Sequence, residues 1–369
     1  MINANELKYW VGFSRIPGIG RIRVSQLKEH FGSLQYAWEA PEGKLKQAGL
    51  DPRSVDNLLL LRPKISLDAE MEKLERYKIR VLVYEDAHYP PRLKEIHDYP
   101  PVLYVRGNLL PGDDPCLAAV GTRRPTIYGR QVTEEIVADL ARSKIIIVSG
   151  LARGIDTLAH RAALDAGGKT IAVLASGLDI VYPAENAKLA QAIMEQGALV
   201  SEYPLCVRPK AENFPLRNRI MSGLSLGVLV VEAGERSGAL ITAFQAVEQN
   251  REVFAIPGSI LSPASKGTNR LIQEGAKLVD NYADIIEELN LSIVAPEQIE
   301  IKEFLPANEV ESAVLKQLTS EPSHIDEICR RSGLTVPEVS STLAMLELKG
   351  VAKQVGNMNY TLCHQVRAE

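Results

Sequence analysis

The sequence predicts a doubly wound α/β domain between Cys116 and Leu278, and two observations support this fold class. First, apolar runs that are too short for buried helices recur through the segment, at residues 117–120, 145–149, 170–175, 228–231 and 253–256. Most are rich in Val and Ile, as is typical of strands covered on both faces of a parallel sheet. Second, amphipathic stretches of helical period, such as residues 131–141 and 239–249, lie between the runs.

A glycine-bearing loop follows each of these predicted strands, at residues 121–126, 150–156, 176–179, 232–238 and 257–259. Loops at the carboxyl ends of parallel strands meet at one edge of the sheet and bind ligands there. Glycine lets the main chain approach a ligand, and the amides at helix starts favour anions. Several of the loops also carry arginine. We therefore expect this edge to bind phosphate, either of a nucleotide or of a nucleic-acid backbone.

Residues 214–220 open a further predicted helix and carry two arginines in its first turns, Arg217 and Arg219. Positive charge at this end opposes the helix dipole, so stability alone does not account for it. A bound anion with Arg217 or Arg219 as its ligand is one explanation. The other is that both arginines are solvated or pair with Glu202 or Glu212.

Other chemistries find less support in the predicted core. Gly168-Lys169-Thr170 lacks the upstream glycine of a P-loop and precedes a strand, and neither a dinucleotide fingerprint nor a nucleophile elbow occurs. A nucleotide or nucleoside hydrolase with Glu232 or Asp156 as its carboxylate catalyst remains the rival function. For Glu232 we favour the other explanation, that it is a strand-end residue that caps loop amides and arginines. We interpret His160 as a helix-surface or packing residue.

Composition places the chain among globular proteins of two or three domains, with 369 residues, 46% hydrophobic and 24% charged. The net charge of −4 provides no overall attraction to nucleic acid, so any such binding requires a local patch. Cys116, Cys206, Cys329 and Cys363 lack metal-site spacing and are interpreted as reduced thiols in a cytoplasmic protein. We expect no signal sequence and no membrane span.

The predicted N-terminal domain, residues 1–62, is helical. Its stretch Ile16-Pro17-Gly18-Ile19-Gly20 precedes a helix pattern at residues 22–30, with Arg15, Arg21 and Arg23 on either side. A hairpin of this kind is similar to the helix-hairpin-helix element, whose glycine amides contact DNA phosphate. The alternative is a plain turn between two helices of a small bundle.

The remaining segments complete the predicted domain organisation. Residues 63–114 contain predicted strands at 80–84 and 102–106, which we expect to extend the main sheet, so that the core spans residues 63–280. Residues 281–307 are acidic and punctuated by proline, as in a linker. Residues 308–369 show three short helices and a hairpin, the pattern of a winged helix. With six Lys or Arg against eight Asp or Glu, that module is a doubtful DNA binder.

The core resembles the DNA-processing protein A (DprA/Smf) family. The matching stretches run in order through nearly the whole core: residues 119–123, 149–156, 176–179 with Tyr182-Pro183, 201–203, 214–219, 232–242, 256–259 and 267–275. The resemblance implies an extended Rossmann-like fold that dimerises, with an N-terminal helical (helix-hairpin-helix or SAM-like) domain and a C-terminal winged helix. It also implies binding of single-stranded DNA and loading of the recombinase RecA during natural transformation, with no enzymatic activity and no cofactor.

The resemblance makes Arg123 the leading phosphate contact. Many members carry a basic residue after the Tyr-Pro pair, where this chain has Ala184, with Lys188 a helical turn further on. Tyr128, Tyr182 or Phe214 would stack on bases. The full set of expected DNA-binding residues is Gly121, Thr122, Arg123, Arg124, Gly150, Arg153, Gly154, Gly177, Lys188, Arg217, Asn218, Arg219, Ser237, Gly238 and Lys266. The loop at 233–238 lacks the P-G-G-x-G-T-x-x-E signature of related nucleotide-cleaving proteins.

Overall fold

The computed structural model describes residues 4–108, 114–291, 302–303, 306–319, 322–362 and 366–367. The chain divides into two compact units, residues 1–294 and 295–369. Among the described residues, no helix is long and apolar enough to cross a membrane. Cys116, Cys206 and Cys329 are free thiols, as expected, whereas Cys363 lies outside the described residues.

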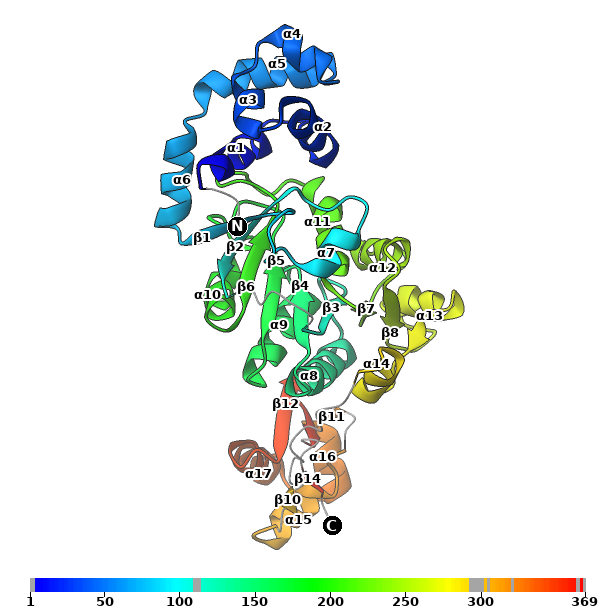
Figure 1. Ribbon diagram of the computed structural model, residues 1–369. Coiled ribbons are helices and arrows are strands. Elements are labelled where there is room, and N and C mark those ends of the chain that lie inside the picture. The colour runs from blue at the N-terminus through cyan, green and yellow to red at the C-terminus, as the bar shows by residue number, and fades with distance from the viewer. Residues whose placement is uncertain are drawn as a thin grey trace. The chain divides into compact units, whose positions relative to one another are not determined.

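The first unit is built on a nine-stranded sheet (Figure 1). Its strand order is β1-β2-β6-β5-β4-β3-β7-β8-β9. The strands are β1 Ile79–Val83, β2 Val102–Gly107, β3 Cys116–Val120, β4 Ile146–Ser149, β5 Thr170–Val173, β6 Ala198–Ser201, β7 Gly227–Val230, β8 Glu252–Ala255 and β9 Lys277–Leu278. The five apolar runs expected between residues 117 and 256 form β3, β4, β5, β7 and β8. These strands are adjacent in the order β5-β4-β3-β7-β8 and pair in parallel, so the predicted α/β class is confirmed.

Seven strands, β3 to β9, form the parallel part of the sheet, and β1 and β2 extend it with antiparallel pairing. Val81 of β1 lies opposite Tyr104 of β2, and Tyr104 lies opposite Ser201 of β6. The expected extension by residues 63–114 is therefore confirmed. Strand β6 was not predicted. It begins directly after the helix that ends at Gln196, so its four residues merge with the apolar pattern of that helix.

Helices cover both faces of the sheet (Figure 1). Side chains of β3 alternate between two apolar clusters, with Leu117 and Ala119 on one face and Ala118 and Val120 on the other. The first face is covered by α8 Ile127–Arg142, α9 Ile155–Asp165 and α10 Ala187–Gln196, the last preceded by the 3-10 turn η2 Ala184–Asn186. The second is covered by α7 Pro91–Glu95, α11 Asn213–Leu224, α12 Gly238–Glu248 and α13 Lys266–Gln273.

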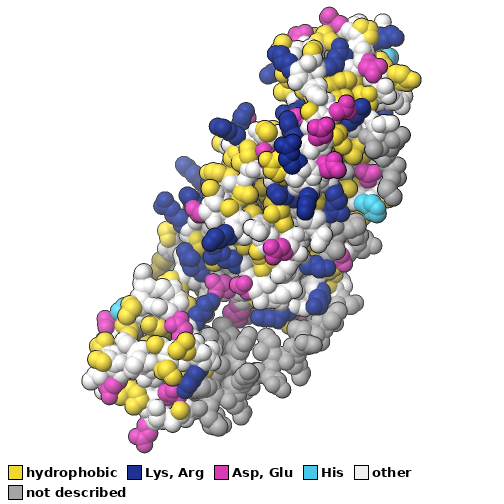
Figure 2. Space-filling model, turned by 90° about the vertical axis from the view of Figure 1, so that its left-hand side faces the viewer, with side chains coloured by type: hydrophobic (Ala, Val, Ile, Leu, Met, Phe, Trp, Pro, Cys, Tyr) yellow, Lys and Arg dark blue, Asp and Glu magenta, His cyan; other side chains and the backbone are white. Residues whose placement is uncertain are grey.

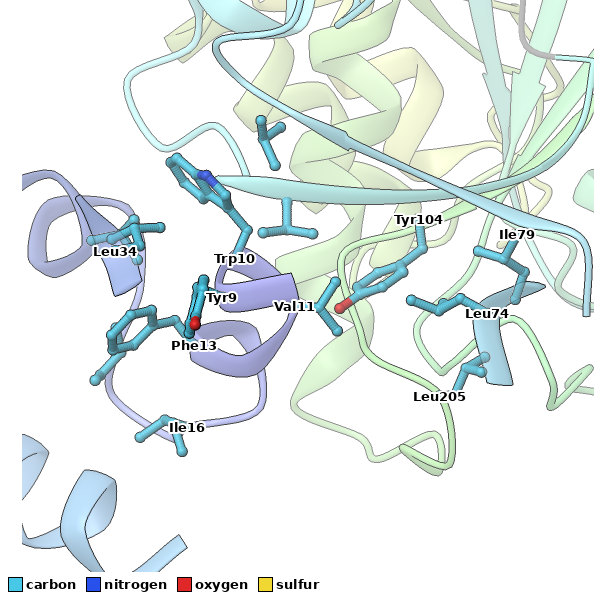
Figure 3. Close-up of a cluster of buried hydrophobic side chains, with 14 of the residues drawn as sticks. Tyr9, Trp10, Val11, Phe13, Ile16, Leu34, Leu74, Ile79, Tyr104 and Leu205 are labelled. Atoms are coloured by element: carbon cyan, nitrogen blue, oxygen red, sulfur yellow. The ribbon is translucent and has the colours of Figure 1, made fainter. Parts of the chain in front are cut away.

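The N-terminal segment is helical, as predicted. Its elements are α1 Ala4–Ser14, α2 Arg21–Phe31, α3 Leu34–Glu39, α4 Glu42–Gln47, α5 Pro52–Leu61, the 3-10 turn η1 Arg62–Lys64 and α6 Leu67–Arg76. Trp10, Phe13 and Leu34 are buried in a cluster that also contains Tyr104 and Leu205 of the sheet region (Figure 3). The hydroxyls of Ser14 and Tyr104 lie 2.7 Å apart. These helices and the sheet therefore share one core.

Part of the predicted acidic linker is structured. Helix α14 (Tyr282–Glu288) lies within residues 281–307 and begins with a capping box between Asn281 and Asp284. Its Ile285 and Ile286 are buried in the cluster on the α8 side of the sheet. The expectation of a linker starting at residue 281 is therefore wrong for this helix, because two buried isoleucines outweigh the acidic composition around them.

The second unit contains the predicted winged helix. Its elements are α15 Glu309–Leu315, β11 Ser323–His324, α16 Ile325–Ser332, α17 Val336–Leu348, β12 Ala352–Gly356 and β13 Asn359–Leu362, and β10 Lys302–Glu303 pairs in parallel with β14 Val366–Arg367. The three-stranded sheet has the order β11-β13-β12. Helix α17 starts at a capping box in which Glu338 accepts from the Thr335 amide at 2.8 Å.

Candidate nucleic-acid interface

The strand order of the sheet reverses at β3, which has β4 on one side and β7 on the other. Ligands of open α/β sheets bind outside the carboxyl ends of the strands at such a switch point. A cleft of about 590 Å³ lies there, lined by the loops after β3, β4 and β7 and by the first turns of α11 and α12. The sequence placed its phosphate-binding loops at this edge, and the cleft is where three of them meet.

Seven of the fifteen expected DNA-binding residues line this cleft: Gly121, Thr122, Arg123, Arg217, Asn218, Ser237 and Gly238. Gly154 packs against the main chain of the lining residue Thr122. Its φ of +79° and the overlap of any Cβ with the Thr122 carbonyl oxygen explain why this position is glycine. Arg236 also lines the cleft and is exposed. We did not select Arg236 from the sequence, although it stands in the same glycine-bearing loop as Ser237.

Arg123 is the expected contact that the cleft presents most openly. It is exposed, and its guanidinium carbon lies 5.6 Å from the centre of the Phe214 ring. The ring of Tyr182 also contacts Phe214, with 5.9 Å between the ring centres, and Tyr182 is half exposed. Among the described residues, no carboxylate forms an ion pair with Arg123. A cation beside one aromatic ring, which itself contacts a second ring, is suited to a phosphate and the base attached to it.

Arg217 borders the same cleft but is buried, with 4% of its surface exposed. Its guanidinium donates to the carbonyl oxygens of Gly150, at 2.7 Å, and Val173, and its Nε donates to Asn218 at 3.2 Å. A Cβ at Gly150 would overlap this guanidinium, which explains the glycine. Burial lowers the pKa of Arg217 to about 10. Its Nη1 is thus bound to main-chain carbonyls and its Nε to a side chain of the protein.

The loop amides after β4 are also occupied. The carboxylate of Asp156 accepts from the amides of Gly150 at 3.1 Å and Ala152 at 3.3 Å. Asp156 is buried, which raises the pKa of its carboxyl, while the nearby Arg217 acts in the opposite direction. We expected these amides to cradle a DNA phosphate. In this structure both amides are instead directed at the Asp156 carboxylate, and their contact with DNA stays a prediction.

Glu232, at the end of β7, has the same kind of structural role. It is 2% exposed and accepts hydrogen bonds from the amide of Thr126 at 2.9 Å and the Thr126 hydroxyl at 2.5 Å. Thr126 in turn caps α8 by accepting from the Gly129 amide at 3.1 Å. The interpretation of Glu232 as a cap of the neighbouring loop is confirmed. The other carboxylate considered for a hydrolase, Asp156, accepts hydrogen bonds from main-chain amides.

The remaining expected residues lie outside the cleft lining. Arg219 pairs with Glu202 at 2.5 Å and with Asp98 at 3.4 Å, so the interpretation in which it pairs with Glu202 holds. Arg153 forms a two-pronged pair with Glu185, at 2.9 and 3.0 Å, and Lys266 lies 3.6 Å from Glu235. Arg124 and Lys188 are exposed, whereas Gly177 is buried against the main chain at Pro204 and Leu205.

His160 is a packing residue, as interpreted. It is fully buried on α9, and its Nδ1 lies 2.7 Å from the Thr170 hydroxyl. Burial, assisted by the charge of Arg217, lowers the pKa of His160 to about 3. Tyr128 is half exposed, but its hydroxyl donates to the Pro257 carbonyl at 2.8 Å, outside the cleft lining.

The N-terminal hairpin makes mainly internal contacts. Gly18 has a φ of +92°, which explains its identity. Arg15 pairs with Glu70 at 2.7 Å and Arg23 pairs with Asp51 at 2.7 Å. Arg21 lies over the ring of Tyr99 at 4.9 Å. All three flanking arginines thus have partners within the protein, which favours the plain-turn interpretation.

Comparison with known proteins shows which family has this arrangement. Residues 80–290 match the model of the DNA recombination-mediator protein A family, and residues 305–358 match the DprA winged helix domain. The Smf protein of Escherichia coli K12 is 42% identical over 318 residues, 83% of each chain. The DNA processing protein DprA of Bacillus subtilis is 46% identical over 57% of this chain and 71% of its own.

The chain belongs to the DNA recombination-mediator protein A family. The crystal structure of DprA from Streptococcus pneumoniae matches with a TM-score of 0.66 and 38% identity, over 78% of this chain and 99% of that one. A DprA from Helicobacter pylori, whose structure is described as showing its single-stranded DNA binding mode, matches with a TM-score of 0.51 and 32% identity, over 58% and 96%. The resemblance stated from the sequence is confirmed.

The DprA winged helix of this chain offers little positive charge on its third helix. Helix α17 carries Glu338 and Glu347 at exposed positions, and the exposed side chains of Met345 and Leu348 lie on the same helix. A recognition helix that reads duplex DNA needs basic side chains to offset the phosphate charge. The exposed surface of α17 therefore lacks the basic side chains that duplex reading requires.

Proposed function

We propose that this DprA-family protein binds single-stranded DNA in the cleft at the carboxyl ends of β3, β4 and β7. The observation that carries the proposal is the position of Arg123, exposed beside the Phe214 ring at the switch point of the sheet. Arg236 adds a second exposed cation to the lining. The Helicobacter pylori relative, described as binding single-stranded DNA, supports the same ligand class.

The proposed interface has two parts. Thr122, Arg123, Arg236, Ser237 and Gly238 line the cleft and contact phosphates, and Phe214 with Tyr182 stacks on bases. Arg124, Arg153, Lys188 and Lys266 lie beyond the lining and would extend the positive field along the strand. Such an interface tolerates any base sequence and weakens with salt.

A mobility-shift comparison of a homopyrimidine strand, a mixed-sequence strand and a duplex of the same length tests this proposal. We expect similar affinity for both single strands, weaker binding of the duplex, and a loss of roughly tenfold or more as salt rises from about 50 to about 200 mM. Preference for the duplex, or affinity that does not change with salt, would contradict it.

We further propose that the protein acts as a cytoplasmic homodimer that protects incoming DNA and loads RecA on it during natural transformation. The family membership supports a role in recombination, and the proposed cleft would hold the single-stranded DNA on which RecA is loaded. Loading is tested by the rate at which RecA starts to hydrolyse ATP on a strand already coated with single-strand binding protein. We expect this protein to shorten the lag. An unchanged lag at saturating protein would remove the loading role while leaving DNA binding intact.

A further inference from the structure

A second depression of the first unit lies away from the DNA cleft, along the outer edge of the sheet. This groove has a volume of about 650 Å³ and is bordered by α6, by β1 and by Asp86 and His88 in the loop that follows β1. Four consecutive residues of β1, Ile79 to Leu82, line it. Because consecutive strand residues point to opposite faces, a groove lined by all four runs along the edge of the strand and not over one face.

The edge of β1 offers main-chain hydrogen-bonding groups to the groove. Tyr84 donates its amide to Pro101 of the neighbouring segment, so in this antiparallel ladder Arg80 and Leu82 also bond towards β2. The main-chain amides and carbonyls of Ile79, Val81 and Val83 must then point away from β2, towards the open edge of the sheet. Asp86 satisfies both main-chain groups of Val83. Its carboxylate accepts from the Val83 amide at 3.1 Å, and its own amide donates to the Val83 carbonyl at 2.8 Å.

Val81 has no such cover. In the part of the chain that the structure describes, neither its amide nor its carbonyl has a hydrogen-bond partner. Proteins commonly blunt an open edge with a charge, a proline or a bulge. Here the nearest device is Arg80, but its guanidinium donates to the Gly107 carbonyl at 2.8 Å and is thereby held towards the end of β2. The edge at Val81 thus remains available to another strand.

The side chains around this edge specify what could pair with it. Met71, Leu74 and Leu82 form an apolar floor, and Asp68, Glu72, Glu75 and Asp86 supply four carboxylates to the rim. Asp68 pairs with Lys8 at 3.2 Å, whereas Glu72 and Glu75 are exposed and have no ion-pair partner among the described residues. In the upper part of the face shown in Figure 2, at the height of α6 in Figure 1, acidic side chains lie close together. This rim repels a nucleic-acid strand.

We propose that the groove between α6 and β1 binds an extended segment of a partner protein, which adds a strand to the edge of β1. The segment would place apolar side chains on the floor at alternate positions and Lys or Arg side chains against Glu72 and Glu75. Main-chain bonds to Val81 supply the affinity in this mode of recognition, and the pockets for alternate side chains supply specificity. The site is independent of the DNA cleft, so a protein partner and a DNA strand could bind at the same time.

Selection from a phage library of random heptapeptides against the full chain tests the proposal, followed by fluorescence anisotropy with the enriched peptides. We expect peptides that alternate apolar residues and carry at least one Lys or Arg. Methylation of the peptide's central amide nitrogens should weaken binding at least tenfold. Enriched peptides that bind equally well after this methylation would overturn the proposal, because main-chain pairing would then be absent.

Two sets of variants locate the binding site. Val81→Pro removes the outward amide, which the sheet itself does not use, and should weaken peptide binding at least tenfold. The double variant Glu72→Lys and Glu75→Lys should weaken it about fivefold at low salt and less at high salt. Glu248→Lys, an exposed charge reversal on α12, is the matched control and should have no effect. Unchanged single-stranded DNA affinity in each variant shows that the fold is intact.

Two other outcomes would also count against the proposal. One is that the library enriches no peptide beyond those found on the Val81→Pro protein. The other is that peptides are absent but Val81→Pro lowers the sedimentation coefficient of the protein, in which case the edge of β1 pairs with a second copy of this chain.

Discussion

Two regions border the proposed DNA cleft and both carry arginines, but the arginines of the two regions differ in their partners. In the loop after β3, Arg123 is exposed and lies against an aromatic ring. In the first turns of α11, Arg217 donates to main-chain carbonyls and Arg219 pairs with Glu202. The difference separates two groups of arginines at this edge, those with partners in the protein and those without an ion pair among the described residues. Arginines with partners hold the strand-end loops in place, and the exposed ones remain available to the ligand.

The largest effect that this comparison predicts is on stability. Arg219→Ala leaves Glu202, whose side chain is only 17% exposed, without its arginine partner, so we expect the free energy of unfolding to fall by about 3 kcal/mol. Chemical denaturation measures it. Arg270→Ala, which breaks an exposed pair with Glu274, should cost less than about 1 kcal/mol. The comparison fails if Arg219→Ala unfolds like the parent protein but no longer binds DNA.

The buried Arg217 also affects His160, whose pKa is lowered to about 3 by burial and by the charge of Arg217. The unfolded chain binds a proton here near pH 6.5 and the folded chain does not, so stability is present above that pH and is lost as the pH falls. Between pH 6.5 and 4.5 we expect a loss of about 2–3 kcal/mol from this residue. Denaturation curves of His160→Gln should lack this part of the pH dependence; an identical slope in both proteins would rule it out.

On the exposed side of the comparison, Arg123→Ala should weaken single-stranded DNA binding by about 1–3 kcal/mol, the range for a lost charged contact. Because Arg123 makes no ion pair within the described chain, its removal should leave the unfolding free energy nearly unchanged. Fluorescence titration at low salt measures the affinity. Arg142→Ala, which breaks a pair with Asp139 on α8, serves as the control and should bind DNA normally.

The smallest effect concerns stacking. Phe214→Leu keeps an apolar side chain but removes the ring beside Arg123 and Tyr182, and we expect DNA affinity to fall by about 1 kcal/mol. Phe244→Leu, an exposed phenylalanine on α12 outside the cleft lining, is the matched control. Equal losses in both variants would mean that the effect does not arise from stacking in the cleft.

The sequence was sufficient to predict much of the fold and the edge of the sheet where the cleft lies. Short Val- and Ile-rich runs followed by glycine loops are local patterns, so the parallel sheet and its ligand-binding edge follow from them. The winged helix was also predicted from local helix and hairpin signals. Strand β6 was not, because its four residues continue an apolar pattern that begins in α10.

The division of labour among the arginines could not be predicted, since it depends on partners remote in sequence. The carbonyls of Gly150, directly after β4, and of Val173 in β5 both accept from the buried Arg217 of α11. Likewise, Asp156 accepts from two loop amides only once α9 is folded against them. Arg236 could have been predicted as a cleft residue, because it lies in the loop after a predicted strand, as Arg123 does.

The most direct test of the DNA site is photocrosslinking of a single strand that carries 5-iodouracil at successive positions, with the linked residues identified by mass spectrometry. Because iodouracil reacts with aromatic side chains that stack on it, we predict links to Phe214 or Tyr182, lost in Arg123→Ala at moderate salt. Links confined to the winged helix or to the N-terminal hairpin, with none in the cleft, would contradict the assignment of the DNA strand to the edge formed by β3, β4 and β7.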